Sequence, residues 1–159
     1  MKAYTLTHCT VADGPALAAN NIPAFWADPH WVLSWRHRTL PYHISQVAKR
    51  YPRNLLKDRD TARHQKAGDP NTGAVVGYSR WYIPPSHAVG EGGKVAWEEA
   101  VVPGVGEEEE KEYIRVAEQE IWDNVDADSH LAVVNRFESE ILDRQPFMRA
   151  LLECLLALI

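Results

Sequence analysis

Glu153 is the residue whose type and position point most directly to chemistry, because it is an acid inside the mostly apolar run of residues 147–159. A carboxylate of this kind takes a proton from a reacting group when it acts as a general base. Within an apolar strand the pKa of its carboxyl group would be raised, since the charged form loses its solvation. The alternative is an exposed charge, because lone acids are rarely buried. The sequence leaves both interpretations open.

An excess of aromatic side chains is the second feature with a chemical interpretation. Aromatic rings dominate the burial of apolar area in protein cores, so core packing is the plainer explanation. Contact with a bound substrate is the alternative. The residues concerned are Phe25, Trp26, Trp31, Trp35, Trp81 and Tyr82.

Several familiar sites have no support in the sequence. Gly-rich residues 90–94 lack the first glycine of a P-loop, and no Ser or Thr follows Lys94. The seven histidines include no i,i+4 pair and no cysteine partner at metal spacing, so no metal site is expected. No Gly-x-Ser-x-Gly motif is present to anchor a hydrolase triad.

The charge pattern argues against nucleic acid as the main partner. The net charge of the 159 residues is −5, whereas phosphate binding needs a basic face. Basic residues nevertheless concentrate in residues 36–66, and residues 98–128 are strongly acidic. This pattern indicates either a solvated helix face plus an acidic insertion, or a basic patch that meets an anionic group such as a nucleotide phosphate.

The cysteine content and the apolar runs bear on location. Cys9 and Cys154 lie far apart in the sequence, which favours a reduced intracellular compartment. The first residues lack the pattern of a signal peptide, and no apolar run reaches the roughly 18 residues that a membrane-spanning helix needs. We therefore expect a soluble protein in the cytoplasm that has no membrane partner.

The elements that must position these residues start with a strand at residues 4–10 and a helix capped by Thr10 and Asp13. That helix carries apolar residues through 16–26 and is followed by a turn at 28–31. Residues 42–60 then show helical spacing, with Pro52 as a kink or division.

A β-hairpin is the strongest local prediction. Strands 63–68 and 74–83 flank the turn 69–73, whose Asp, Pro, Asn and Gly residues favour tight backbone conformations. After it we expect a flexible loop at 86–93 and helices at 107–123 and 131–142.

Residues 147–159 are predicted to be buried and extended, at least over 151–156. A short amphipathic helix is the competing outcome, because Leu and Ala favour helix.

Motifs in this order resemble one known family. The sequence of residues 16–31, ALAANNIPAFWADPHW, is similar to its first-helix region, and residues 63–67 with 77–81 are similar to its second and third strands. Residues 140–142 followed by 152–155 are similar to its approach to the fourth strand. The chain resembles the N-terminal half of the GCN5-related N-acetyltransferase (GNAT) superfamily, especially the fungal members.

The resemblance implies an α+β fold of the acyl-CoA N-acyltransferase type, in which a central, mostly antiparallel sheet is flanked by helices. On this basis residues 1–159 form a single domain that is truncated after the fourth strand, and residues 86–130 are a family-specific insertion.

The resemblance also implies an activity, namely acetyl transfer from acetyl-CoA to the amine of a small molecule or peptide. Phe25, Trp26, Trp81 and Tyr82 would then contact the acceptor. Glu153 would take the proton of the amine. Two further residues, Leu155 and Leu156, would contact acetyl-CoA.

One departure from the family limits this expectation. In the family the fourth strand leads into a Gln/Arg-x-x-Gly-x-Gly/Ala loop, whose N–H groups bind the pyrophosphate of coenzyme A. This chain has Leu-Ala-Leu-Ile at 156–159 in that place. We therefore expect a catalytically impaired enzyme that binds acetyl-CoA weakly. The alternative is a non-catalytic association module that dimerises, or needs a partner, through an open sheet edge.

Overall fold

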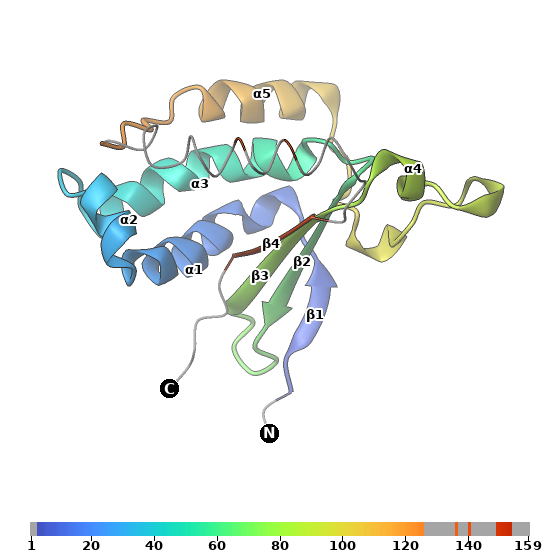
Figure 1. Cartoon of the computed structure of the whole chain (residues 1–159), viewed down its shortest axis with the longest axis horizontal. Coiled ribbons are helices and arrows are strands. Elements are labelled where there is room, and N and C mark those ends of the chain that lie inside the picture. Colours follow the sequence, from blue (N-terminus) through green and yellow to red (C-terminus); the bar gives the residue numbers. More distant parts are fainter. Residues whose placement is uncertain (1–2, 126–135, 137–139, 141–148, 154–159) are drawn as a thin grey trace.

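A four-stranded antiparallel sheet is the centre of the fold in the computed structural model, which describes residues 3–125, 136, 140 and 149–153 (Figure 1). The α+β class predicted from the sequence is therefore confirmed. The strands lie side by side in chain order, and each pairs antiparallel with the next. They are β1 (Thr5–His8), β2 (Ala62–Gly68), β3 (Val75–Tyr82) and β4 (Arg149–Glu153).

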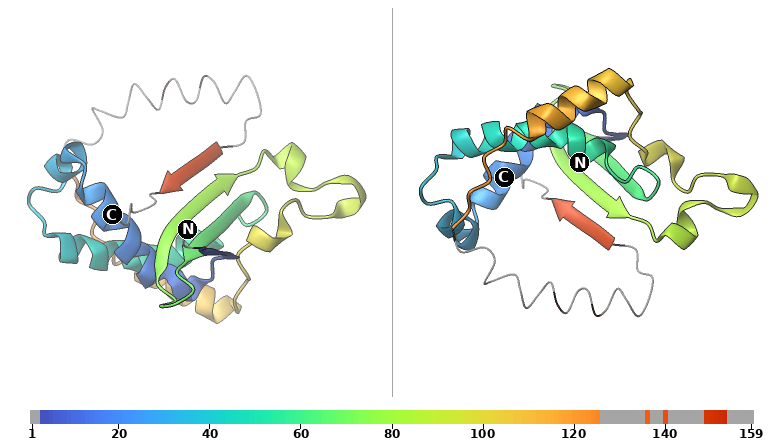
Figure 2. Two further views of the ribbon diagram at one scale, coloured as in Figure 1. Left: turned by 90° about the horizontal axis from the view of Figure 1, so that it is seen from below. Right: turned by 90° about the horizontal axis from the view of Figure 1, so that it is seen from above.

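The helices form two further layers on one side of the sheet. Helices α1 and α3 pack on the sheet and on each other, and α5 lies along the outer side of α3 (Figures 1 and 2). The helices are α1 (Gly14–Trp26), α2 (Pro29–Ser34), α3 (Leu40–Leu56), α4 (Pro85–Ala88) and α5 (Glu107–Ala117). Buried apolar residues between these layers form the core, namely Cys9, Leu17, Ala18, Ile22, Val47, Tyr51, Leu55, Leu56, Tyr78 and Val102.

The crossing of α1 and α3 depends on a glycine. A Cβ atom added to Gly14 would lie 3.0 Å from Cδ of Pro52, so the missing side chain lets the two helices approach. Pro52 does not divide the second helical region, because α3 is a single element from Leu40 to Leu56. The predicted capping box of Thr10 and Asp13 forms, with the N–H of Thr10 donating to Oδ2 of Asp13 at 2.7 Å, but it caps a 3-10 turn at Val11–Asp13 that leads into α1.

The predicted hairpin is confirmed in its strands and in its turn. Residues of β2 pair with those of β3, from Ala62 opposite Tyr82 onward. In the turn, the N–H of Asn71 donates to Oδ1 of Asp69 at 2.9 Å, and Gly73 adopts a φ of 71°. Turn chemistry of this kind is local, which explains why the sequence predicts it.

Three predicted elements need correction. Of the turn predicted at 28–31, only residue 28 lies in a bend, and residues 29–31 belong to helix α2. The helix expected at 107–123 ends at Ala117, because the residues after it make contacts with α3 that a continuous helix would not allow. The loop at 86–93 begins with α4 and continues as a projecting finger, in which Val89 and Val95 form an antiparallel bridge.

The C-terminal strand prediction is confirmed where the structure describes it. Residues 149–153 are extended as β4 and pair with β3. The predicted continuation to residue 156 and the predicted helix at 131–142 lie outside the described residues, as does the burial of residues 147–159. Within the described part of the chain, no helix is both long and apolar enough to cross a membrane.

Candidate functional site

Glu153 ends β4 and lies opposite Tyr78 of β3 in the strand register. Tyr78 stands on the side of the sheet that the helices cover, because its ring centroid is 6.1 Å from that of Tyr51 in α3. The backbone thus places the predicted general base on the same rung as a buried tyrosine. Leu155 and Leu156, the predicted contacts for acetyl-CoA, lie outside the described residues.

His64 of β2 is the hydrogen-bond partner of Tyr78, with 2.7 Å between Nδ1 and Oη. The histidine is 1% exposed, and its burial, followed by nearby Arg80 and Arg63, lowers its pKa to about 4. Its ring is therefore neutral at pH 7. Among the described residues, Nε2 of His64 has no hydrogen-bond partner. A neutral imidazole with so low a pKa holds Tyr78 through a hydrogen bond and does not take its proton.

Cys9, which lies close to this pair in the core, is not a nucleophile. Burial, followed by the charge of Asp13, raises the pKa of its thiol to about 12, and Lys66 only partly opposes this. A thiol with such a pKa stays protonated at neutral pH, and the thiolate is the reactive form. The Lys66 ammonium forms an ion pair with Asp13 at 2.5 Å, which ties β2 to the start of α1. We assign a structural role to all three residues.

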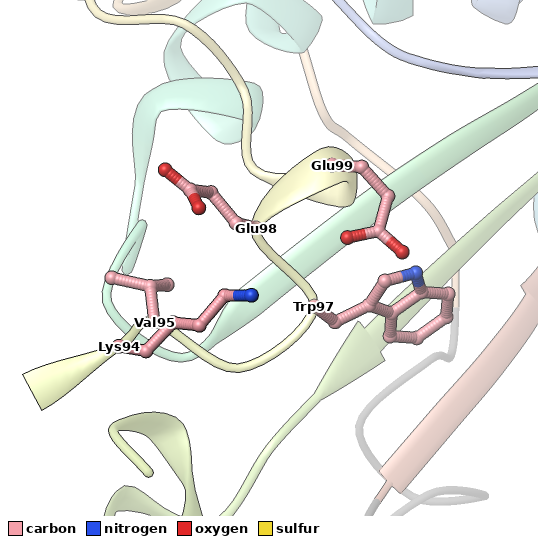
Figure 3. Close-up of a pocket in the computed structure, with 5 residues that line it drawn as sticks. All are labelled: Lys94, Val95, Trp97, Glu98 and Glu99. Carbon is pink, nitrogen blue, oxygen red and sulfur yellow. The ribbon is translucent and has the colours of Figure 1, made fainter. Parts of the chain in front are cut away.

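An open hollow of about 570 Å³ lies at the end of β3 that leads into α4 (Figure 3). Its lining combines an aromatic ring, two carboxylates and one ammonium group. The residues, which we call the strand-end hollow, are Lys94, Val95, Trp97, Glu98 and Glu99. Carboxylates beside an aromatic face suit an organic cation, because both attract positive charge.

Trp97 occupies an unusual backbone conformation in this hollow. Its φ of 53° lies in the left-handed region, which is costly for a bulky residue. The preceding residue fixes this geometry, because the carbonyl oxygen of Ala96 accepts a hydrogen bond of 2.8 Å from Nε of Arg63. Arg63 is 0% exposed, so a buried side chain of β2 anchors the segment that carries the hollow.

The predicted residues Trp81 and Tyr82 lie at this end of β3. The indole of Trp81 packs against Trp97 with ring centroids 5.9 Å apart, and its Nε1 donates to Oγ of Ser79 at 3.2 Å. The ring of Tyr82 lies under the guanidinium of Arg80, at 5.5 Å from its central carbon. Trp81 therefore borders the strand-end hollow.

Phe25 and Trp26, the other predicted acceptor residues, belong to a different group of rings at the end of α1. Phe25 stacks on Trp31 with centroids 4.8 Å apart, and Trp26 lies 5.8 Å from His43. In Figure 1 the end of α1 adjoins α2, whereas β3 runs away from it toward α4. We call this group the helix-end cluster, consisting of Phe25, Trp26, Trp31, Trp35, His43 and Trp122.

The structure thus divides the predicted acceptor residues between two places. Trp81 and Tyr82 are close to the strand-end hollow, and Phe25 and Trp26 are part of the helix-end cluster. The sequence did not indicate Trp97 or its neighbouring acids, because the irregular residues 95–106 show no periodic pattern. The one available signal was the pair of acids directly after a tryptophan.

A phosphate site for coenzyme A does not fit the described residues. Gly104 and Gly106 precede α5, and a glycine pair before a helix is a common setting for phosphate. The first turn of α5, however, consists of four glutamates at 107–110, which repel an anion. The start of α1 likewise carries Asp13.

Other cofactor sites find no support in the part of the chain that the structure describes. These residues contain no group of three or more His, Cys, Asp or Glu side chains that could hold a metal ion. Residues 90–94, the Gly-rich segment, form the tip of the finger, where the N–H of Gly90 donates to the carbonyl of Lys94 at 2.8 Å.

Comparison with known proteins finds no matching family model, and searches of curated proteins and of solved structures also return no match. A functional proposal for this chain therefore depends on its geometry and on the resemblance of its sequence motifs.

Proposed function

We propose that the chain carries the acceptor-binding half of a GNAT-type N-acetyltransferase, an enzyme that transfers an acetyl group from acetyl-CoA to an amine. The observation that carries the proposal is the strand order. Helices follow β1, a hairpin follows the helices, and β4 returns beside β3, which is the order that the sequence resemblance implies. This order places Glu153 on the rung of Tyr78.

The strand-end hollow is the proposed entrance for the amine. Its two carboxylates, Glu98 and Glu99, outnumber its one ammonium group, Lys94, so the hollow favours a cation. The rings of Trp81 and Trp97 add aromatic faces at the same place. An amine is bound as its ammonium form and becomes a nucleophile when it loses a proton. The proposed acceptor, Glu153, lies three residues along the β3–β4 ladder from the Trp81–Ala150 pair, so the hollow is proposed as the entrance and not as the place of proton transfer.

We expect this chain to bind the acetyl donor, acetyl-CoA, weakly. The starts of α1 and α5 carry acids that repel the pyrophosphate of coenzyme A, and binding of that group normally relies on several backbone N–H donors at once. We therefore expect acetyl-CoA to bind with a dissociation constant above the micromolar range in calorimetric titration of the 159-residue chain. Micromolar binding would show that a phosphate site had been overlooked.

Release of free thiol from acetyl-CoA tests the activity. The chain is incubated with millimolar acetyl-CoA and a panel of small and peptide amines, and the thiol is followed with a colorimetric reagent. We expect slow, amine-dependent release that Glu153→Gln reduces at least tenfold. Trp97→Ala should raise the KM for the amine and leave kcat nearly unchanged.

The matched control is Glu118→Gln, which removes an exposed acid remote from β4 and should leave the rate unchanged. Equal rates for the parent chain and Glu153→Gln would remove the assigned role of that residue. An absence of release with every amine would contradict the acetyltransferase proposal for this chain.

A second candidate function, association without catalysis, is favoured by the exposure of β1. All four residues of this edge strand are exposed, and Leu6 is 68% exposed. An edge strand offers backbone groups to a further strand. Sedimentation velocity over a hundredfold range of concentration tests this function, since a module of this kind should dimerise and Leu6→Lys should prevent it.

A further inference from the structure

An irregular segment after α5 crosses the outer side of α3 and reaches α2. We call residues 118–125 the strap. Figures 1 and 2 show it running from the end of α5 across α3 toward α2. After the turn at 118–119 it contains neither helix nor strand. Its course is therefore set by contacts with α2 and α3 rather than by its own secondary structure.

Opposite charges hold the strap on the helices. The ammonium of Lys49 donates to the carbonyl oxygen of Gln119 at 3.1 Å. The guanidinium of Arg50 pairs with Glu120 at 3.0 Å. Near α2, Arg38 forms an ion pair with Asp123. The basic region noted in the sequence thus meets the acidic region of the same chain.

Two further hydrogen bonds join the backbone of the strap to the described residues of α3 and α2. The N–H of Ile121 donates to Oε1 of Gln46 at 3.2 Å, and the N–H of Val125 donates to the carbonyl oxygen of Ser34 at 2.9 Å. These two bonds fix the position of the strap along the groove between α2 and α3. An extended peptide that is not covalently attached could make the same two bonds.

Trp122 is the central contact of the strap. Its ring lies 4.5 Å from Trp35 and 5.3 Å from His43, measured between centroids. The guanidinium carbon of Arg50 lies 3.7 Å from the centroid of the Trp122 ring. Even so, Trp122 is 40% exposed, so it lies on the helix-end cluster rather than inside it.

Beneath Trp122 two buried polar atoms lack partners among the described residues. They are Nε2 of His43, a residue that is 1% exposed, and Nε1 of Trp31. Buried polar atoms are normally hydrogen-bonded, so each exception needs an explanation. Trp122 covers these atoms without bonding to them, so the strap leaves two polar atoms of the helix-end cluster unsatisfied.

We propose that the groove between α2 and α3 is a binding site for an acidic peptide segment with a central tryptophan, and that the strap occupies it here as an intramolecular ligand. The pattern recognised is Glu-x-Trp-Asp, as at residues 120–123. Arg50 and Arg38 bind the two acids, and the tryptophan ring packs on the helix-end cluster. A matching segment of a partner protein binds after the strap is displaced.

Competition within the chain sets the expected affinities. A tethered segment acts at an effective concentration of about millimolar, so it outcompetes a weakly binding free peptide. Removing the side chain of Trp122 weakens the binding of the strap and leaves the groove free for a peptide. The partly exposed ion pair between Arg38 and Asp123 contributes little and weakens with salt. The side chain of Glu120 is only 8% exposed, so its pair with Arg50 is the contact that a displacing segment must replace.

The test uses a fluorescent peptide with the sequence of residues 118–125 and measures its anisotropy. The parent chain should bind it at least tenfold more weakly than the Trp122→Ala variant. Adding Arg50→Glu to that variant should abolish binding, and a peptide with alanine in place of tryptophan should not bind. Binding to Trp122→Ala should weaken as sodium chloride is raised.

Equal binding to the parent chain and to a folded Trp122→Ala variant would overturn the proposal, as would no binding to either. If circular dichroism shows Trp122→Ala to be unfolded, Asp123→Asn replaces it, because that change removes only exposed contacts. Dimerisation of the parent chain that is lost in Trp122→Ala, measured by light scattering, would instead identify the strap of a second copy as the occupant and contradict a separate partner. None of these measurements involves acetyl-CoA, so their outcome is independent of the proposed acetyltransferase activity.

Discussion

The helix-end cluster and the strand-end hollow are both built around tryptophans, yet their surroundings differ. In the cluster, Trp35 is 1% exposed, and Arg50 of α3 lies over the neighbouring ring of Trp122. In the hollow, Trp97 lines an open space together with Glu98 and Glu99. An aromatic residue type alone therefore does not show whether a ring belongs to the core or to a binding site. The charge and the exposure of the neighbouring residues show this, and contacts distant in sequence set both.

The largest difference between the two regions should appear in the free energy of unfolding when one ring is truncated in each. Trp35→Ala should lower the free energy of unfolding by about 3–5 kcal/mol, because it leaves a cavity in a closed cluster. Trp97→Ala should lower it by less than about 1.5 kcal/mol, since that ring is not enclosed. Guanidinium denaturation followed by circular dichroism measures both. Equal losses would mean that the hollow is part of the core.

A second prediction uses the neutral histidine that only the cluster contains. Burial, followed by the charge of Arg50, lowers the pKa of His43 to about 4, although Asp123 opposes the shift. The unfolded state has an ordinary pKa near 6.5 and binds the proton first, so stability falls as the pH drops from about 6.5 to about 4. The loss from His43 should approach about 3 kcal/mol.

His43→Phe keeps a ring among the tryptophans and should flatten this acid dependence by roughly half, because the buried His64 has a similarly lowered pKa and contributes alongside it. Urea denaturation at a series of pH values measures the slope. His87→Phe, a change at an exposed position, should leave the slope as it is. An unchanged slope in His43→Phe would mean that the cluster admits water.

The smallest expected effect concerns the backbone conformation of Trp97 in the hollow. Trp97→Gly and Trp97→Ala both remove the ring, but only alanine retains a Cβ atom in the left-handed region where φ is 53°. The glycine variant should therefore be more stable than the alanine variant by about 1 kcal/mol. Thermal melts of the two variants measure the difference. The reverse order would indicate that the backbone relaxes once the ring is gone.

Local chemistry explains which parts of the fold were predictable. The hairpin turn is specified by neighbouring residues such as Asp69 and Gly73, and helix α3 by its apolar spacing. Helix α5 stops early for a reason outside its own sequence. The residues after Ala117 bind Gln46 and Lys49 of α3, and periodicity carries no information on such contacts.

The candidate site was less predictable than the fold. Glu153 was placed correctly in a strand, because the apolar run follows Pro146 where the resemblance implies the fourth strand, whereas the run alone also allowed a helix. The grouping of Phe25 and Trp26 with Trp81 rested on resemblance alone, and the structure places these residues in separate ring groups. Trp97 could not be anticipated, since its conformation depends on a bond from a side chain of β2.

That side chain, Arg63, has a consequence for the order in which the molecule assembles. Its guanidinium donates to the carbonyl oxygens of Arg59, Asp60, Ala62 and Ala96. Three of these acceptors precede or adjoin it in the chain, so they are present as soon as β2 emerges during synthesis. The fourth acceptor, the carbonyl oxygen of Ala96, is synthesised later and binds a guanidinium that is already in position. We expect the hairpin to be a template on which the later segment docks, much as the strap docks on a completed α3.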